Sequence, residues 1–69
     1  MYTNIEAERV RAQLTKEEIS KKLGITSKTY LGYVRGSRPI PSDVLLSLSR
    51  MFGCKVDYLL GVSPADESA

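Results

Sequence analysis

The sequence has no histidine, and it has no glycine-rich loop that follows a strand-like segment. Its one cysteine, Cys54, lies among apolar residues after Gly53. A lone cysteine cannot form an internal disulfide, and this setting predicts a small buried thiol. The residue patterns that support acid–base or nucleophilic catalysis are therefore missing, and we expect no enzymatic activity, no metal site and no cofactor.

Long apolar segments are also absent. No apolar run approaches the ~18 residues of a membrane span. The first residues, MYTNIEAERVR, do not contain the apolar stretch of a signal peptide. We expect a soluble cytoplasmic protein that has no membrane partner.

Negative charge is missing from one third of the chain. No aspartate or glutamate occurs between Ile19 and Ser42, and all eight acids, Glu6 and Glu8 among them, lie outside this stretch. The same stretch contains five positive residues, Lys21, Lys22, Lys28, Arg35 and Arg38. A charge run is often only a solvated surface, but this segregation concentrates positive potential and favours an anionic partner.

The 69 residues, 42% of them apolar, suffice for one globular domain. A chain of this size removes only about 60% of its unfolded surface from water on folding. We therefore expect no second, effector-sensing domain. We expect a folded domain over residues 1–61, and a disordered tail over 62–69, whose sequence VSPADESA is small, polar and acidic.

Residues 16–35 read as two short helices that meet at a tight corner. Gly24 suits the left-handed residue that ends the first helix. Ser20, one turn earlier, is small enough to let the second helix cross nearby, and Thr26 is a good N-cap for that helix. The connection is thus about three residues long, and we expect Tyr30 and Tyr33 to face the core. This is the geometry of a helix-turn-helix.

The stretch from Leu14 to Gly36, LTKEEISKKLGITSKTYLGYVRG, resembles the phage-repressor and Cro type of helix-turn-helix domain, and the later GCKVDYLLG resembles its closing helix. The resemblance covers residues 5–61. It implies an all-α fold of five short helices around one core, like that of the lambda repressor. It also implies that the third helix enters the major groove of double-stranded DNA while the second crosses the backbone.

Local signals place the five helices. We expect the first over Asn4–Ala12, capped by Thr3 with Glu6 in a capping box, and its packed face to carry Ile5, Arg9 and Ala12. We expect the others over Lys16–Leu23 with a Thr15 and Glu18 capping box, Ser27–Arg35, Asp43–Phe52 capped by Ser42, and Val56–Leu60, uncapped at Lys55.

The resemblance assigns DNA contacts to matching positions. It implies that Thr15 and Lys16 lie at the backbone, that Ser27, Lys28 and Gly32 face base pairs, and that Thr29 and Arg35 face the strand. Thr26, which caps this helix, is also expected to bind DNA, and Ser37 and Arg38 are expected to meet phosphates at the edge. Lys28 is the best candidate for base readout, because an ammonium can donate to guanine O6 and N7.

Arg9 has no obvious partner. In the family, an arginine at this position commonly meets an acid late in the third helix, and the matching position here is Val34. Arg9 must reach water, another acceptor such as a helix C-terminal carbonyl, or a phosphate. Leu31 and Val34 are expected to place apolar surface near the exposed side of the third helix, where they touch thymine methyls, pack on neighbouring helices or meet a protein partner.

Taken together, these features predict a sequence-specific, double-stranded DNA-binding transcriptional regulator of bacterial or phage origin, acting as a repressor and nucleoid-associated when bound. We expect a homodimer on a two-fold operator, joined through Val56, Tyr58 and Val62 near the closing helix. The alternative is a protein-interaction module, such as a repressor modulator or antitoxin, that binds another regulator or a toxin. Leu31, Gly32 and Val34 motivate that alternative.

Overall fold

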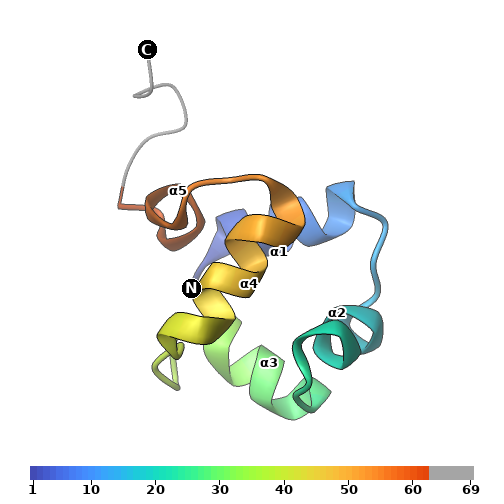
Figure 1. Ribbon diagram of the computed structural model, residues 1–69. Coiled ribbons are helices and arrows are strands. Elements are labelled where there is room, and N and C mark those ends of the chain that lie inside the picture. The colour runs from blue at the N-terminus through green and yellow to red at the C-terminus, as the bar shows by residue number, and fades with distance from the viewer. Residues whose placement is uncertain (63–69) are drawn as a thin grey trace.

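The computed structural model describes residues 1–62, and this part of the chain is all-helical, as the sequence predicts. Its five α-helices are α1 (Thr3–Arg11), α2 (Lys16–Leu23), α3 (Ser27–Arg35), α4 (Ser42–Phe52) and α5 (Val56–Leu60), and Figure 1 shows their arrangement. The predicted bounds of α2, α3 and α5 are confirmed. The predicted tail lies outside the described residues except for Val62. Within residues 1–62, no helix is both long enough and apolar enough to cross a bilayer.

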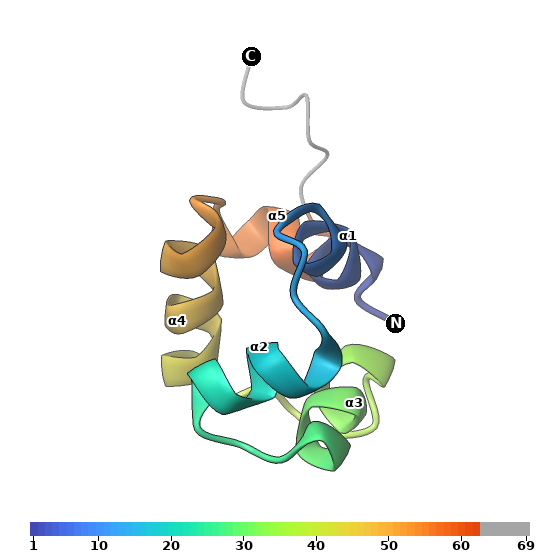
Figure 2. The same ribbon diagram turned by 90° about the vertical axis from the view of Figure 1, so that its right-hand side faces the viewer.

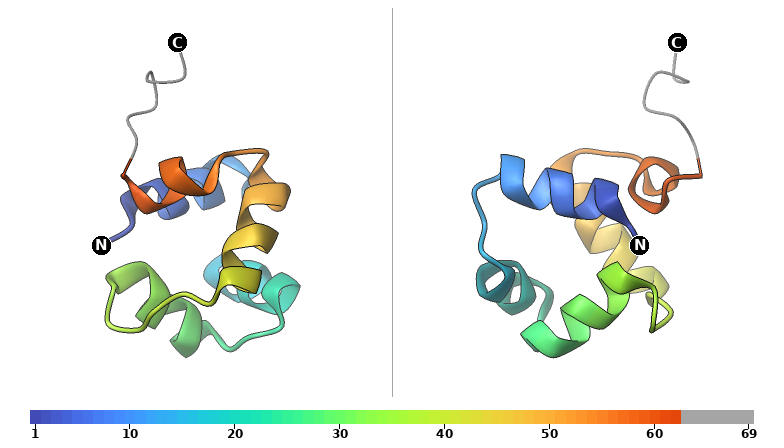
Figure 3. Two further views of the ribbon diagram at one scale, coloured as in Figure 1. Left: turned by 60° about the vertical axis from the view of Figure 1, so that its left-hand side comes forward. Right: turned by 180° about the vertical axis from the view of Figure 1, so that it is seen from behind.

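The helices form two groups joined by α4. Helices α1 and α5 lie side by side at one end of the molecule, and α2 and α3 lie together at the other end (Figures 1 and 3). Helix α4 runs between the two ends, and its upper part packs on α1 and α5 (Figure 2). This arrangement leaves the outer side of α2 and α3 uncovered by the rest of the described chain.

All five helices contribute to the core. Its buried apolar side chains are Ile5, Ile19, Tyr30, Val34, Val44, Leu48 and Leu59. Tyr30 is therefore a core residue, as predicted, and Tyr33 packs against the core while half-buried. Val34 does not lie near the exposed side of α3, because only 2% of it is exposed, and of its three predicted possibilities it packs on neighbouring helices. Four residues after Tyr30, Val34 shares the inner face of α3, and the N–H of Tyr2 donates to its carbonyl at 2.8 Å.

Two predicted N-caps are not caps. Helix α1 begins at Thr3 after Tyr2, and α4 begins at Ser42 after Pro41, with no side-chain cap bond in either case. The Glu6 carboxylate cannot close a box with Thr3, because it binds Arg9 and Tyr30 instead. Pro41 already has the extended backbone of a cap residue and accepts the first helical bond, from the N–H of Leu45.

Helix α1 also ends differently from the prediction, at Arg11. Ala12, expected on its packed face, is exposed. Gln13 follows with a φ of 60°, the only positive φ at a non-glycine residue of the described chain. The N–H of Gln13 donates to Val10 and that of Leu14 to Arg9, which is the bonding pattern of a Schellman cap. A glutamine thus occupies the left-handed position that Gly24 takes after α2.

Two residues near the C-terminal helices also depart from expectation. Cys54 is half-buried rather than fully buried, because it lies in the short connection between α4 and α5. Burial is still the main cause that raises the pKa of its thiol. Glutamate side chains are mostly exposed in proteins, but Glu8 is only 6% exposed. Its carboxylate accepts a hydrogen bond from the Tyr58 hydroxyl at 3.0 Å, which offsets the cost of burial.

Candidate nucleic-acid interface

The corner between α2 and α3 is fixed by local bonds. Gly24 ends α2 with a φ of 72°, and the N–H of Ile25 donates back to the Ser20 carbonyl at 3.0 Å. Ser20 is 2% exposed, and its hydroxyl donates to the Lys16 carbonyl at 2.6 Å. Thr26 then starts α3 by accepting the N–H of Thr29 at 3.2 Å. The three-residue connection predicted from the sequence is confirmed.

The first turn of α3 faces outward. Thr26 and Lys28 are exposed, and Ser27 and Thr29 are half-buried. This turn lies at the tip of the molecule farthest from α1 and α5 (Figure 3). The leading end of α3 is therefore available to a large ligand such as a nucleic acid.

The hydroxyls of the two threonines at the start of α3 form a hydrogen bond with each other. Thr26 Oγ1 lies 3.0 Å from Thr29 Oγ1 and also accepts the Thr29 N–H. Thr26 thus serves the helix as a cap. Ser27 and Lys28, between the two threonines, remain the side chains of this turn that are best placed to bind a ligand.

The N-terminus of α2 is closed by the predicted capping box. Thr15 accepts the N–H of Glu18 at 3.0 Å, and the Glu18 carboxylate accepts the N–H of Thr15 at 2.8 Å. The bonds to Thr15 are the main cause that lowers the pKa of Glu18. The N–H groups of Lys16 and Glu17 lack helical acceptors and point out of the helix end. They can bind a phosphate oxygen, with the exposed Lys16 side chain beside them.

The C-terminal end of α3 leads into a second basic segment. Arg35, Ser37 and Arg38 are all exposed. Gly36 ends the helix in the left-handed region, and the Ser37 hydroxyl donates to the Gly32 carbonyl at 3.2 Å. Gly32 itself is only half-exposed, and the aliphatic part of Arg38 lies directly over it.

The electrostatics of this end are strongly one-sided. The five positive residues between Ile19 and Ser42 are all exposed: Lys21, Lys22, Lys28, Arg35 and Arg38. In residues 1–62 the ion pairs are Glu6 with Arg9 and Glu8 with Arg11, both within α1. None of the five cations forms an ion pair with an acid of the described chain. Lys22 has only a weaker Coulombic interaction with Glu18, whose pKa it helps to lower, so most of this positive charge faces solvent.

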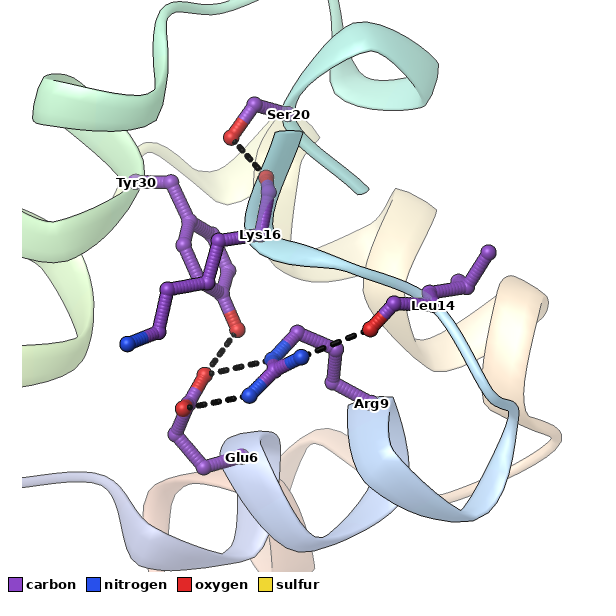
Figure 4. A network of polar contacts seen from close by, with 6 residues as sticks. All are labelled: Glu6, Arg9, Leu14, Lys16, Ser20 and Tyr30. Atoms are coloured by element: carbon purple, nitrogen blue, oxygen red, sulfur yellow. Dashed lines mark hydrogen bonds and ion pairs between the residues drawn. The ribbon is translucent and has the colours of Figure 1, made fainter. Parts of the chain in front are cut away.

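A polar network behind α3 connects it to α1 and to the loop before α2 (Figure 4). Arg9 forms two bonds of 3.0 Å to the Glu6 carboxylate and donates to the Leu14 carbonyl at 2.6 Å. The Tyr30 hydroxyl donates to the same carboxylate. Of the three possibilities for Arg9, the structure selects an internal acceptor, a carbonyl near the C-terminus of α1, and adds Glu6.

This network shifts the proton affinities of its members. The hydrogen bonds from Arg9 are the main cause that lowers the pKa of Glu6. Burial of the Tyr30 hydroxyl, followed by its bond to Glu6, raises the pKa of Tyr30. The pairing of Glu6 with Arg9 was not among the possibilities predicted for Arg9. The signal was the i, i+3 spacing of Glu6 and Arg9, which places both side chains on one side of α1.

The fold and the outward corner agree with the comparison to known proteins. The family model described as "Helix-turn-helix" matches residues 5–59. The chain belongs to this helix-turn-helix family, of the phage-repressor and Cro type. The resemblance read from residues 14–36 is thereby confirmed.

Three curated relatives from Bacillus subtilis (strain 168) match the chain. They are the uncharacterized HTH-type transcriptional regulator YobD, 39% identical over 51 residues, and the HTH-type transcriptional regulator ImmR, 38% identical over 53. The uncharacterized HTH-type transcriptional regulator YqaE is 35% identical over 57 residues. These matches cover 74%, 77% and 83% of this chain but only 46%, 42% and 49% of the relatives, which are thus about twice as long as the matched region. No solved structure gives a significant match.

Proposed function

We propose that this chain is a sequence-specific double-stranded DNA-binding regulator of transcription, with α3 in the major groove. The observation that carries the proposal is the exposed first turn of α3, which bears Lys28 and lies in a stretch without acids. An α-helix fits the major groove, and base edges there accept hydrogen bonds from lysine and serine side chains. In this arrangement Ser27 and Lys28 read bases, and Thr29 and Gly32 lie along the groove.

Phosphate contacts would hold α3 in register. The N-terminus of α2, with Thr15 and Lys16, meets one strand, and Arg35, Ser37 and Arg38 meet the backbone on the other side of α3. Thr26 contributes by capping the helix. Each phosphate that the protein neutralises should release counterions, so log K should fall with log salt by roughly 0.9 per contact.

The regulator is proposed to act as a homodimeric repressor that occludes a promoter. One helix in one groove contacts too little surface for tight, specific binding, whereas two half-sites about 34 Å apart multiply the contact. Val62 is 71% exposed and follows α5, where Val56 and Tyr58 are half-buried. This small apolar surface is the proposed contact between subunits.

Selection of bound sites from a random duplex library tests the proposal. We expect an enriched two-fold motif, and a binding constant for that motif that falls steeply with salt. If the selection enriches no sequence and binding is weak and insensitive to salt, the alternative of a protein-interaction module is favoured. One of the three residues that support this alternative no longer does so, because Val34 is buried rather than exposed.

A further inference from the structure

Gly32 lies inside a helix, and its backbone conformation does not require a glycine. It is the sixth residue of α3 and is not among the positive-φ residues of the chain. Alanine is a better helix former than glycine at such a position. The reason for glycine should therefore be found in the space beside it.

That space is filled by Arg38. A Cβ atom placed on Gly32 would lie 3.0 Å from Arg38 Cδ, 3.2 Å from Arg38 Cγ and 3.6 Å from Ser37 Oγ. The first two distances are shorter than ordinary carbon–carbon contacts. The stem of Arg38 thus rests on the bare Cα of Gly32, and any side chain at this position would push it away.

The loop after α3 is folded back to produce this contact. The Gly32 carbonyl accepts the N–H of Ser37 at 3.0 Å, the N–H of Arg38 at 3.2 Å and the Ser37 hydroxyl at 3.2 Å. Pro39 follows Arg38 and restricts its backbone to extended conformations. Both the backbone and the stem of Arg38 are held against α3, while the residue as a whole remains exposed.

We infer that Gly32 is a positioning residue for Arg38, and does not itself read a base. Because Gly32 has no side chain, the aliphatic stem of Arg38 can pack against α3 and is held there. The Arg38 side chain therefore loses little conformational entropy when its guanidinium binds a DNA phosphate. The inference rests on the proposed function. It assigns the cost of a side chain at position 32 to Arg38, whereas the resemblance implies that Gly32 faces base pairs.

A double-mutant cycle separates these two explanations. Wild type, Gly32→Ala, Arg38→Ala and the double variant would be titrated with a fluorescent duplex of mixed sequence at low salt. Ordering a long side chain on binding weakens affinity about 2- to 10-fold. We expect Gly32→Ala to lose about this much in the wild-type background and nothing in the Arg38→Ala background.

An equal loss in both backgrounds would mean that position 32 meets the DNA directly, and would overturn the inference. Arg35→Ala is the matched control, because Arg35 is an exposed arginine at the end of the same helix. A cycle between Gly32→Ala and Arg35→Ala should show no coupling. If it showed as much coupling as the cycle with Arg38, the assignment of the effect to Arg38 would fail.

A second readout does not depend on DNA. In the Arg38→Ala background, Gly32→Ala should raise the urea midpoint, because alanine favours the helix and no longer displaces the Arg38 stem. In the wild-type background the rise should be smaller, and equal rises would overturn the contact itself. If no variant binds DNA, the proposed function fails and the role at the phosphate fails with it, whereas DNA binding without coupling overturns the inference alone.

Discussion

Gln13 occupies the left-handed position that most helices of this chain give to glycine. In this conformation a residue with a Cβ is about 1–2 kcal/mol less stable than glycine. Glycine loses part of this advantage, because its unfolded state is more flexible and folding costs it more conformational entropy. We therefore expect Gln13→Gly to raise the free energy of unfolding by about 0.5–1 kcal/mol, measured by urea denaturation.

Gly24→Ala provides the converse control, since Gly24 takes the same position after α2 with a φ of 72° and nothing within 4 Å of its missing Cβ. It should destabilise the fold by about 1 kcal/mol. A loss of stability in Gln13→Gly would show that the glutamine side chain makes a stabilising contact that outweighs the strain.

Glu6 links stability to acidity. Its pKa in the folded protein lies below the ordinary value of 4.5, because Arg9 and Tyr30 donate to the carboxylate. A carboxylate whose pKa is lower in the folded protein than in the unfolded chain stabilises the fold at every pH above its unfolded pKa. This stabilisation disappears as the pH falls through the folded pKa. The stability difference between wild type and Glu6→Gln should thus be constant from neutral pH to about pH 5 and shrink below it.

Urea midpoints between pH 2 and 7 would measure this difference. The exposed Glu17, changed to glutamine, controls for the loss of a surface carboxylate near the same end of the chain. A Glu6→Gln difference that persists unchanged at low pH would indicate that the carboxylate charge is not what Arg9 and Tyr30 recognise.

If the proposed function is right, alanine substitutions at Lys28 and at Arg38 should change DNA binding in different ways. Loss of a base-reading side chain should cost about 1–3 kcal/mol of discrimination between the selected site and its variants, so Lys28→Ala should flatten base preference. Arg38→Ala should weaken all duplexes alike. Binding constants on the selected site and on single-base variants measure both effects, and an unchanged preference in Lys28→Ala would exclude it from readout.

At the scale of helices, the crossing of α2 over α3 depends on a small side chain. Ser20 is 2% exposed, and its hydroxyl is tied to its own helix at Lys16. Forcing a leucine into this crossing should cost about 1–3 kcal/mol of unfolding free energy through overpacking. Ser47→Leu is the control, because Ser47 lies on the exposed side of α4. Equal urea midpoints for the two variants would mean that the crossing has spare room.

The α2–α3 unit could be predicted from the sequence because its signals are local. Thr15, Glu18, Gly24 and Thr26 act within four residues of themselves, and their bonds are found in the structure as predicted. The proposed groove contacts have another source, because the resemblance assigns them to matching positions of this unit.

Elements whose side chains have distant partners could not be read in the same way. Glu6 has the spacing of a capping box with Thr3, but its carboxylate accepts a hydrogen bond from the hydroxyl of Tyr30, 24 residues away. Glu8 looks like a surface acid until Tyr58, 50 residues away, is placed over it. Val34 is a related case, because it belongs to a core that residues of all five helices form.

For the whole molecule, the proposed dimer makes a prediction about mass. Val62→Asp should shift sedimentation from dimer toward monomer and should weaken binding to a two-fold site more than to a single half-site. Leu46→Asp is the matched control, since Leu46 is 50% exposed on α4, away from the proposed patch. A wild-type protein that remains monomeric at high micromolar concentration, with or without DNA, would contradict the dimer.

The separation of the two ends of the fold has a practical consequence. Helix α5 closes the described chain at the end opposite the α2–α3 corner (Figure 2). A fluorophore or surface tether joined after Val62 would therefore start on the far side of the domain from any duplex that α3 engages. An immobilised sample could be loaded with operator, washed and released repeatedly without the anchor blocking α3, provided that the tether is long enough to leave the proposed subunit contact at Val62 free.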